Sequence, residues 1–121
     1  MARISKLCAA PIAALFMFAC SSGSPKPIAQ IASSEGAIRG ANEAGAQSVP
    51  NAKLYVQMAQ ENRERALVLV EKDKNKQAEG LLMRSEADAE LALAIARADR
   101  AARDAGKASE RVEELKGSVT P

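Results

Sequence analysis

The sequence predicts an all-α protein: a short N-terminal helix plus a long antiparallel helical hairpin whose last helix overhangs its partner. Three observations predict this class. Alanine, the strongest helix former, supplies 26 of the 121 residues. Apolar residues recur at intervals of three and four along most of the chain, the spacing of one helix face. Aromatic residues make up only 2% of the chain, so the core must be thin and built from small side chains.

The composition excludes several classes of function. There is no His, which removes Ser-His-Asp and Cys-His catalysis. Two cysteines and three aromatic residues are too few for a zinc site or a base-stacking surface. We therefore expect a non-enzymatic protein with no cofactor, no metal, no nucleic acid and no small-molecule substrate. An acidic pair among Glu86, Asp88 and Glu90 is the remaining route to catalysis, but charged helix faces are usually solvated.

Residues 1–19 are typical of an export signal. Arg3 and Lys6 precede an uncharged apolar run over 7–19, which is shorter than the about 20 residues that cross a membrane. A basic start, a short apolar run and a small residue at the end predict a secretory signal peptide. The alternatives are a buried N-terminal helix and an uncleaved anchor.

The end of this segment, Met17-Phe18-Ala19-Cys20, resembles a bacterial lipoprotein signal, although that pattern prefers a small residue at Phe18. The resemblance implies cleavage before Cys20, acylation of Cys20 and attachment to a membrane. Ser21 after the cysteine resembles enterobacterial signals for outer-membrane sorting, with the protein facing the periplasm. The competing cut after Ser21 would release a soluble periplasmic protein.

The chain after the signal divides into three parts. Residues 20–28 form a Ser/Gly/Pro tether after the lipidated cysteine, because Pro25 and Pro27 forbid a helix. Residues 29–116 form the helical domain, and residues 117–121 form a flexible tail. Without residues 1–19 the chain keeps 15 basic and 15 acidic residues, so its charge gives no argument for nucleic acid or anionic lipid.

The first two helices are expected over residues 29–46 and 51–72. The buried face of the first comprises Ile31, Ser34, Ile38, Ala41 and Gly45, and that of the second comprises Tyr55, Ala59, Asn62, Ala66 and Leu69. Glycines 36, 40 and 45 either weaken the first helix or permit close approach to another helix. Ser48 or Val49 caps the second helix ahead of Pro50. The turn over residues 73–76 is expected to place Asn75 in a left-handed conformation.

The third helix is expected over residues 77–115 and carries two apolar seams. The inner seam, which faces the second helix, comprises Ala78, Leu82, Ser85, Ala89, Ala92 and Ala96. The candidate partner-contact seam comprises Leu91, Ile95, Ala98, Ala102, Ala105, Ser109 and Val112, at coiled-coil spacing. Residues 89 and 91 differ by about 200° around the helix, so this second seam points away from the hairpin. The first helix could cover only Leu91 and Ile95.

Residues 99–116 therefore extend beyond both other helices. Two interpretations remain open for this segment. One is a frayed, solvent-exposed helix, and the other is an interaction helix that pairs with its own copy or with another envelope protein.

The chain is also similar to the bacterial lipoproteins that carry the domain of unknown function 4398. The similarity covers residues 28–115 and is carried by the order of weak motifs at 37–46, 50–54, 76–82 and 87–92. It implies a short helix, an alanine- and leucine-rich helical hairpin and an envelope lipoprotein without catalytic residues.

These observations predict a structural or adaptor lipoprotein of the cell envelope, with the membrane as one partner through Cys20. The alternative is a soluble periplasmic module of tetratricopeptide type that binds peptides in the hairpin. A stable array of that type needs at least three repeats, and the sequence contains one helical pair.

Overall fold

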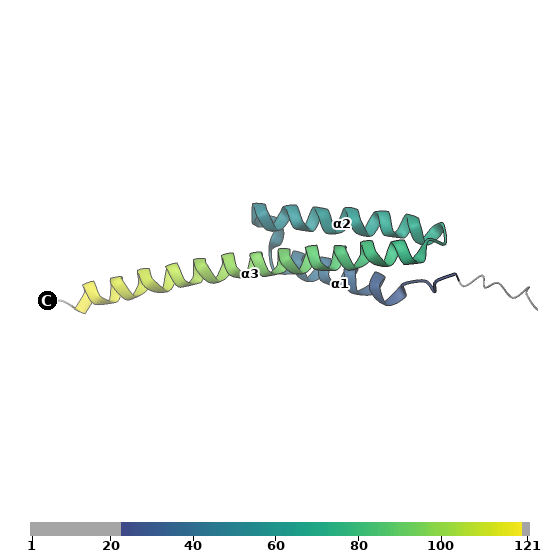
Figure 1. Ribbon diagram of the computed structural model, residues 1–121. Coiled ribbons are helices and arrows are strands. Elements are labelled where there is room, and N and C mark those ends of the chain that lie inside the picture. The colour runs from purple at the N-terminus through teal and green to yellow at the C-terminus, as the bar shows by residue number, and fades with distance from the viewer. Residues whose placement is uncertain (1–22, 120–121) are drawn as a thin grey trace, which may run out of the picture.

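The protein consists of three α-helices and one short 3₁₀-helix within residues 23–119, the part of the chain that this computed structural model describes. The elements are α1 (Ile28–Glu43), η1 (Ala46–Ser48), α2 (Pro50–Glu71) and α3 (Asn75–Val119). Figure 1 shows α2 and α3 as an antiparallel hairpin with α3 running far beyond it. The predicted fold class is confirmed. The predicted signal peptide and Cys20 lie outside the described residues.

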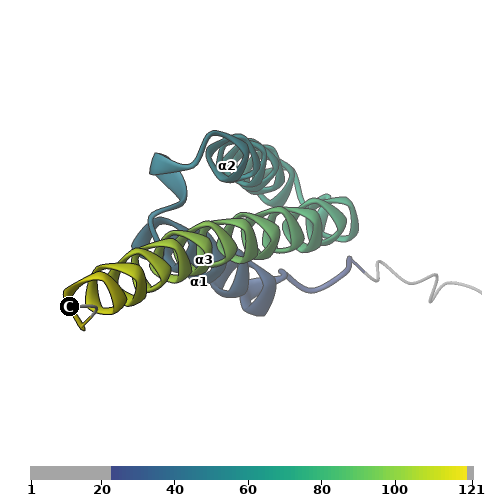
Figure 2. The ribbon, with the colours of Figure 1, turned by 90° about the vertical axis from the view of Figure 1, so that its left-hand side faces the viewer.

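Helix α3 is the central element. It packs against both α2 and α1, whereas α1 and α2 contact each other more sparsely. Figure 2, viewed from the C-terminal side, shows α1 and α2 on different sides of α3. At about 1.5 Å per residue, the 45 residues of α3 span about 67 Å. Its C-terminal part therefore has no neighbouring helix.

The core is divided into two clusters of small apolar residues. One lies near the α1–α2 connection and includes Ala41, Val56 and Ala92. The other lies near the α2–α3 turn and includes Ala66, Ala78 and Leu82. Leu82 and Val56 are the largest fully buried side chains in the described chain. Alanine at most other core positions lets the helix axes approach closely but buries little area per residue.

The connection between α1 and α2 begins earlier than expected. α1 ends at Glu43 rather than at residue 46, and residues 46–48 form η1. The reason is Gly45, whose φ of 89° lies in a left-handed region that breaks an α-helix. Val49 then caps α2 in an extended conformation and Pro50 occupies its first turn, as one of the two predicted caps required.

The interpretation of the α1 glycines as close-contact positions is wrong. A Cβ atom added at Gly36 or Gly40 would lie more than 4 Å from every atom of a neighbouring helix. These two glycines lower the intrinsic helix propensity of α1, and no packing contact in the described chain requires them.

The predicted buried face of α2 is confirmed at Ala59 and Ala66 and differs toward the N-terminus of the helix, where Val56 is buried in place of Tyr55. Its buried residues are Ala52, Val56, Ala59 and Ala66, whereas Tyr55 is only half-buried. Intervals of four, three and four residues lead from Ala52 through Val56 and Ala59 to Arg63. The structure accommodates Arg63 because its guanidinium extends sideways to Glu35 of α1, with 2.9 Å between Nη2 and Oε2.

The turn between α2 and α3 uses Asp73 as its left-handed residue, with φ of 55°. The prediction of Asn75 in this role is wrong, because Asn75 is the first residue of α3. Asn75 is buried, and its Nδ2 donates a hydrogen bond to the Ser24 carbonyl oxygen at 2.6 Å. This bond fastens the start of the described chain to the hairpin turn.

Both ends of the helical region are longer than predicted. Ile28, assigned to the tether, is the first residue of α1, and Pro27 before it is buried. At the other end α3 continues through residues 117–119, which were assigned to a flexible tail. Gly117 does not end the helix, and the Ser118 hydroxyl donates to the Leu115 carbonyl oxygen within the last turn.

Candidate interaction surface on helix α3

The inner seam of α3 is buried as predicted. Ala78, Leu82, Ser85, Ala89, Ala92 and Ala96 are all buried. At its centre the Ser85 hydroxyl donates a 2.7 Å hydrogen bond to the carbonyl oxygen of Ala59 on α2. A polar group in so tight a contact is tolerated because it is hydrogen-bonded. The hairpin therefore uses one face of α3, and that face ends at Ala96.

The candidate partner-contact seam lies mostly on the open surface. Ile95 is half-buried and packs beside the core cluster near the α1–α2 connection, whereas Leu91 is 42% exposed. The remaining five positions, Ala98, Ala102, Ala105, Ser109 and Val112, are all exposed. The Ser109 hydroxyl donates to the Ala105 carbonyl oxygen in its own helix. The structure thus accounts for Ile95 and leaves the other six without a cover.

A longer apolar line runs along the same side of α3, and the predicted seam contains only four of its ten positions. We call this line the outer stripe. Its spacing alternates strictly between four and three residues over more than four heptads, and each position is Ala, Leu or Val. It comprises Ala87, Leu91, Ala94, Ala98, Ala101, Ala105, Ala108, Val112, Leu115 and Val119. Counting backward from Leu115 in heptads would have revealed it.

Every residue of the outer stripe is exposed. Its larger members are exposed by 42% at Leu91, 48% at Val112 and 61% at Leu115. Exposed apolar surface on one continuous line is the pattern that marks protein interaction sites, unlike isolated surface leucines.

The outer stripe and the inner seam share one period and differ in direction. Ala98 follows Ala96 by two residues, which places it about 200° around the helix. The stripe therefore lies on the opposite side of α3 from the hairpin seam. Over residues 87–96 its positions are exposed although most other residues of the helix are at least half-buried, and beyond residue 97 every residue except the half-buried Asp99 is exposed.

Charged residues flank the outer stripe along one edge at intervals of seven. In chain order they are Glu90, Arg97, Asp104 and Arg111, so the sign alternates from one heptad to the next. The opposite edge carries Ile95, Ala102 and Ser109 and is uncharged over the same length. Within the described chain, no ion pair is formed by Glu90, Arg97 or Arg111.

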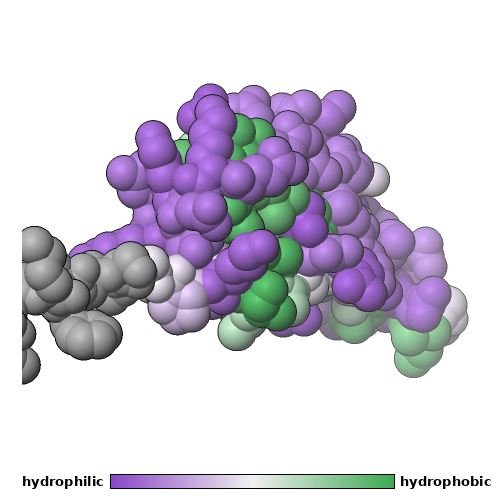
Figure 3. All heavy atoms as spheres, turned by 90° about the vertical axis from the view of Figure 1, so that its right-hand side faces the viewer, coloured by the Kyte–Doolittle hydropathy of each residue, from purple (hydrophilic) through white to green (hydrophobic). Residues whose placement is uncertain are grey.

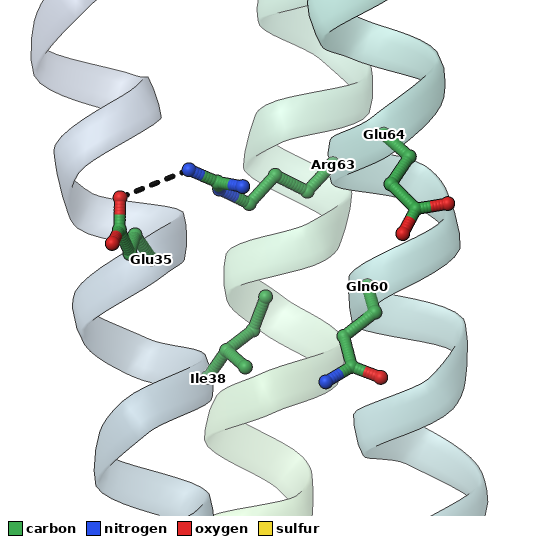
Figure 4. A pocket seen from close by; sticks show the side chains of 5 residues that line it. All are labelled: Glu35, Ile38, Gln60, Arg63 and Glu64. Carbon is green, nitrogen blue, oxygen red and sulfur yellow. Dashed lines mark hydrogen bonds and ion pairs between the residues drawn. The ribbon is translucent and has the colours of Figure 1, made fainter.

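Two pockets of the described chain are open to solvent and lined mainly by polar and charged residues. A pocket of about 350 Å³ lies between α1 and α2, lined by Glu35, Ile38, Gln60, Arg63 and Glu64. Figure 4 shows its Arg63 side chain turned toward Glu35, so the central cation is already paired. Another, of about 340 Å³, borders Ser24 and Glu79 near the hairpin turn. Neither has the apolar enclosure of a small-molecule site.

The three acidic residues considered for catalysis differ in their surroundings. Asp88 accepts a hydrogen bond from Asn62 of α2 at 3.0 Å, Glu86 is half-buried and Glu90 is exposed. Within residues 23–119 no three His, Cys, Asp or Glu side chains are grouped as metal ligands would be.

The described surface also bears on membrane contact. Among the helices of residues 23–119, none has an apolar stretch long enough to cross a bilayer. Seen from the end that carries the α2–α3 turn, hydrophilic residues cover most of the molecule and hydrophobic residues form a band between them (Figure 3).

Comparison of the chain with protein-family models, curated proteins and solved structures found no match. The likeness to the domain of unknown function 4398 family therefore stays a prediction.

Proposed function

We propose that this protein is a non-enzymatic lipoprotein of the bacterial cell envelope that presents α3 as a docking helix. The acylated Cys20 would attach it to the outer membrane on the periplasmic side. The α1–α2–α3 bundle would act as the base, and the projecting part of α3 would bind another helix. The protein would serve as a structural or adaptor element.

The observation that carries the docking role is the open outer stripe. Isolated helices are marginally stable in water because nucleation is costly, and most helices in proteins are stabilised by packing. Residues 98–119 have no buried member in the described chain, and all are exposed except the half-buried Asp99. A heptad pattern that continues through such a segment supports the binding of a partner helix along it.

The membrane role is supported by the residues that precede the helical bundle in the sequence. The basic start, the short apolar run and Cys20 match a lipoprotein signal. One acyl chain binds a bilayer only marginally, whereas two or more hold stably. The chain enters the bundle at the hairpin-turn end, where Ser24 is bonded to Asn75. Anchoring at this end would leave the tip of α3 on the far side from the lipid.

The proposal is tested by intact-mass measurement of the protein extracted from cell membranes, with a Cys20→Ser variant as control. We expect a native chain that begins at Cys20 and carries the added mass of acyl groups. Detergent should release it from membranes and high salt should not. The Cys20→Ser protein should leave the membrane fraction. A native chain that begins at Ser22, without lipid and in the soluble fraction, would contradict the proposal.

The docking role has its own readout in the membrane-bound protein. Removal of residues 98–119 should leave the mass, the acylation and the membrane location unchanged. The same deletion should abolish the higher-mass species obtained by chemical cross-linking in cells. Persistence of those species without residues 98–119 would contradict the docking role.

A further inference from the structure

We infer that the partner of the outer stripe is a second copy of this chain, bound antiparallel with the two-fold axis between Asp99 and Arg100. This inference rests on the proposed docking role of α3 and names its partner. It is drawn from the stripe, from its alternating charged edge and from the direction in which the stripe faces.

The charged edge selects the direction of pairing. The charged edge consists of the residues immediately before Leu91, Ala98, Ala105 and Val112. In an antiparallel pair this edge of one copy faces the same edge of the other copy, and opposite charges that meet there favour association. With the axis between Asp99 and Arg100, Arg97 faces the partner's Asp104 and Glu90 faces the partner's Arg111. The members of each pair differ by about 3 Å in height. Two-fold symmetry doubles both pairs, giving four contacts of opposite sign.

Other arrangements lose some or all of these four contacts. If the axis moves to Arg103, Arg97 faces the partner's Arg111 and the two copies of Asp104 face each other. In a parallel pair Arg97 faces the partner's Ala102 and Asp104 faces the partner's Ser109, so no opposite charges meet. Like charges directly across an interface disfavour it. Of the antiparallel alignments that keep the apolar layers, only this one places all four charged residues of the edge opposite a charge of the other sign.

The apolar positions fit the same alignment by size. Ala98 comes level with the partner's Ala101, and Ala94 with the partner's Ala105. Leu91 meets the partner's Ala108, and Val112 meets the partner's Ala87. Each layer from residue 87 to 112 thus places no more than one large side chain opposite an alanine. Large and small residues that alternate across facing positions interdigitate well.

The hairpin leaves room for this partner. The outer stripe faces away from the inner seam, and its residues between 87 and 96 are exposed. Each projecting segment would run back along the outer side of the other copy's hairpin, bringing its Leu115 level with the exposed Met83. The contact covers about 40 residues of each α3, which is about 60 Å in length and about 10 Å in width.

This footprint predicts the strength of the dimer. It amounts to roughly 600 Å² on each copy, somewhat below the about 800 Å² per partner of a standard interface. Alanine at most layers limits the apolar gain further. We expect a dissociation constant in the range of about 10 μM, and weaker binding as salt screens the four charge pairs.

The experiment uses a chain that begins at Ser21. It contains the whole described fold and has no cysteine, since the two cysteines of the sequence are Cys8 and Cys20. In sedimentation equilibrium we expect a reversible monomer–dimer equilibrium. Arg97→Glu alone and Asp104→Arg alone should each weaken the dimer about fivefold to tenfold. The double variant Arg97→Glu/Asp104→Arg should restore it. Glu110→Arg, on the opposite side of the helix, is the control and should have no such effect.

Cysteine pairing tests the direction directly. In the antiparallel dimer Leu91→Cys lies opposite the partner's Ala108→Cys, so a mixture of the two variants should form a mixed disulfide. Leu91→Cys alone should not, because its two copies would be about 25 Å apart along the helix, beyond the about 7 Å that a disulfide spans. Cross-linking of Leu91→Cys with itself would show a parallel pair and overturn the alignment.

The outcomes separate this inference from the proposed function. A strictly monomeric chain at about 500 μM, well above the expected dissociation constant, overturns the self-pairing. In that case the acylation of Cys20 and the docking of another envelope protein stand untouched. Unacylated native protein that still forms the antiparallel dimer would overturn the membrane role and leave the pairing in place.

Discussion

The Ser85 hydroxyl of α3 donates a buried hydrogen bond of 2.7 Å to the carbonyl oxygen of Ala59 on α2. Both residues are fully buried, so this bond lies in the contact between the two hairpin helices. Because the residues at this contact are small, neither helix can move toward the other without a clash or away without loss of the bond.

Ser85 is therefore a sensitive position. We expect Ser85→Ala to lower the free energy of unfolding by about 1 kcal/mol, the net value of a typical hydrogen bond. Ser85→Val should cost about 1–3 kcal/mol, because it adds volume to a tight contact. Urea denaturation followed by circular dichroism measures both. Ser109→Ala is the matched control, since its hydroxyl bonds only within the exposed end of α3. An effect of Ser109→Ala as large as that of Ser85→Ala would contradict this account.

Leu82 should contribute the most of any single core side chain to stability. It is the largest fully buried residue of the described chain, and the alanines around it cannot fill the space it would leave. Leu82→Ala should lower the free energy of unfolding by about 2–5 kcal/mol. Leu54→Ala, at a position 53% exposed on α2, should change it by less than about 0.5 kcal/mol. Equal effects of the two substitutions in thermal unfolding would be inconsistent with the described core.

Two glycines should respond to alanine with opposite signs. Gly45 has φ of 89°, so Gly45→Ala should destabilise the protein by about 1–2 kcal/mol. Gly36 lies inside α1 with open space at its Cβ position, so Gly36→Ala should stabilise it by about 0.5–1 kcal/mol. Chemical denaturation of both variants measures the difference. A gain in stability from Gly45→Ala would refute the left-handed conformation at that residue.

The projecting part of α3 should be dispensable for the fold of a monomer. Residues 98–119 have no buried member, and the inner seam ends at Ala96. We expect a chain without them to keep its melting temperature within about 2 °C, since surface positions contribute little to stability. The melting temperature must be measured at protein concentrations too low for dimers to form. A fall of many degrees would mean that the segment supports the bundle.

The inner seam could be predicted residue by residue because a local rule governs it. Six small or apolar residues at three- and four-residue spacing can face only one partner in an antiparallel hairpin. The face of α2 could not be predicted in the same way. Arg63 interrupts the spacing that contains Val56, and only the position of Glu35 on another helix shows how its charge is accommodated.

The turn before α3 and the surface of α3 could also be predicted from the sequence only in part. Asp73 and Asn75 are similar in their tolerance of left-handed backbone. What distinguishes them is the bond between Asn75 and Ser24, which are 51 positions apart in the sequence. The outer stripe, by contrast, was visible in the sequence, and the exposure of its C-terminal part followed from the predicted overhang of residues 99–116. The exposure of Leu91 could not be predicted, because it depends on which face of α3 the first helix covers.

The bond between Asn75 and Ser24 places the entry of the chain at one end of α3, while Val119 lies at the other. A pull applied between an attached leader and a bound tip would therefore pass lengthwise through one uninterrupted helix. Such traction would stretch the backbone hydrogen bonds of α3 in series and leave the contacts of α2 with α3 largely unstrained. The molecule would behave as a stiff rod, and under such a force its attachments at the two ends would fail before the rod itself.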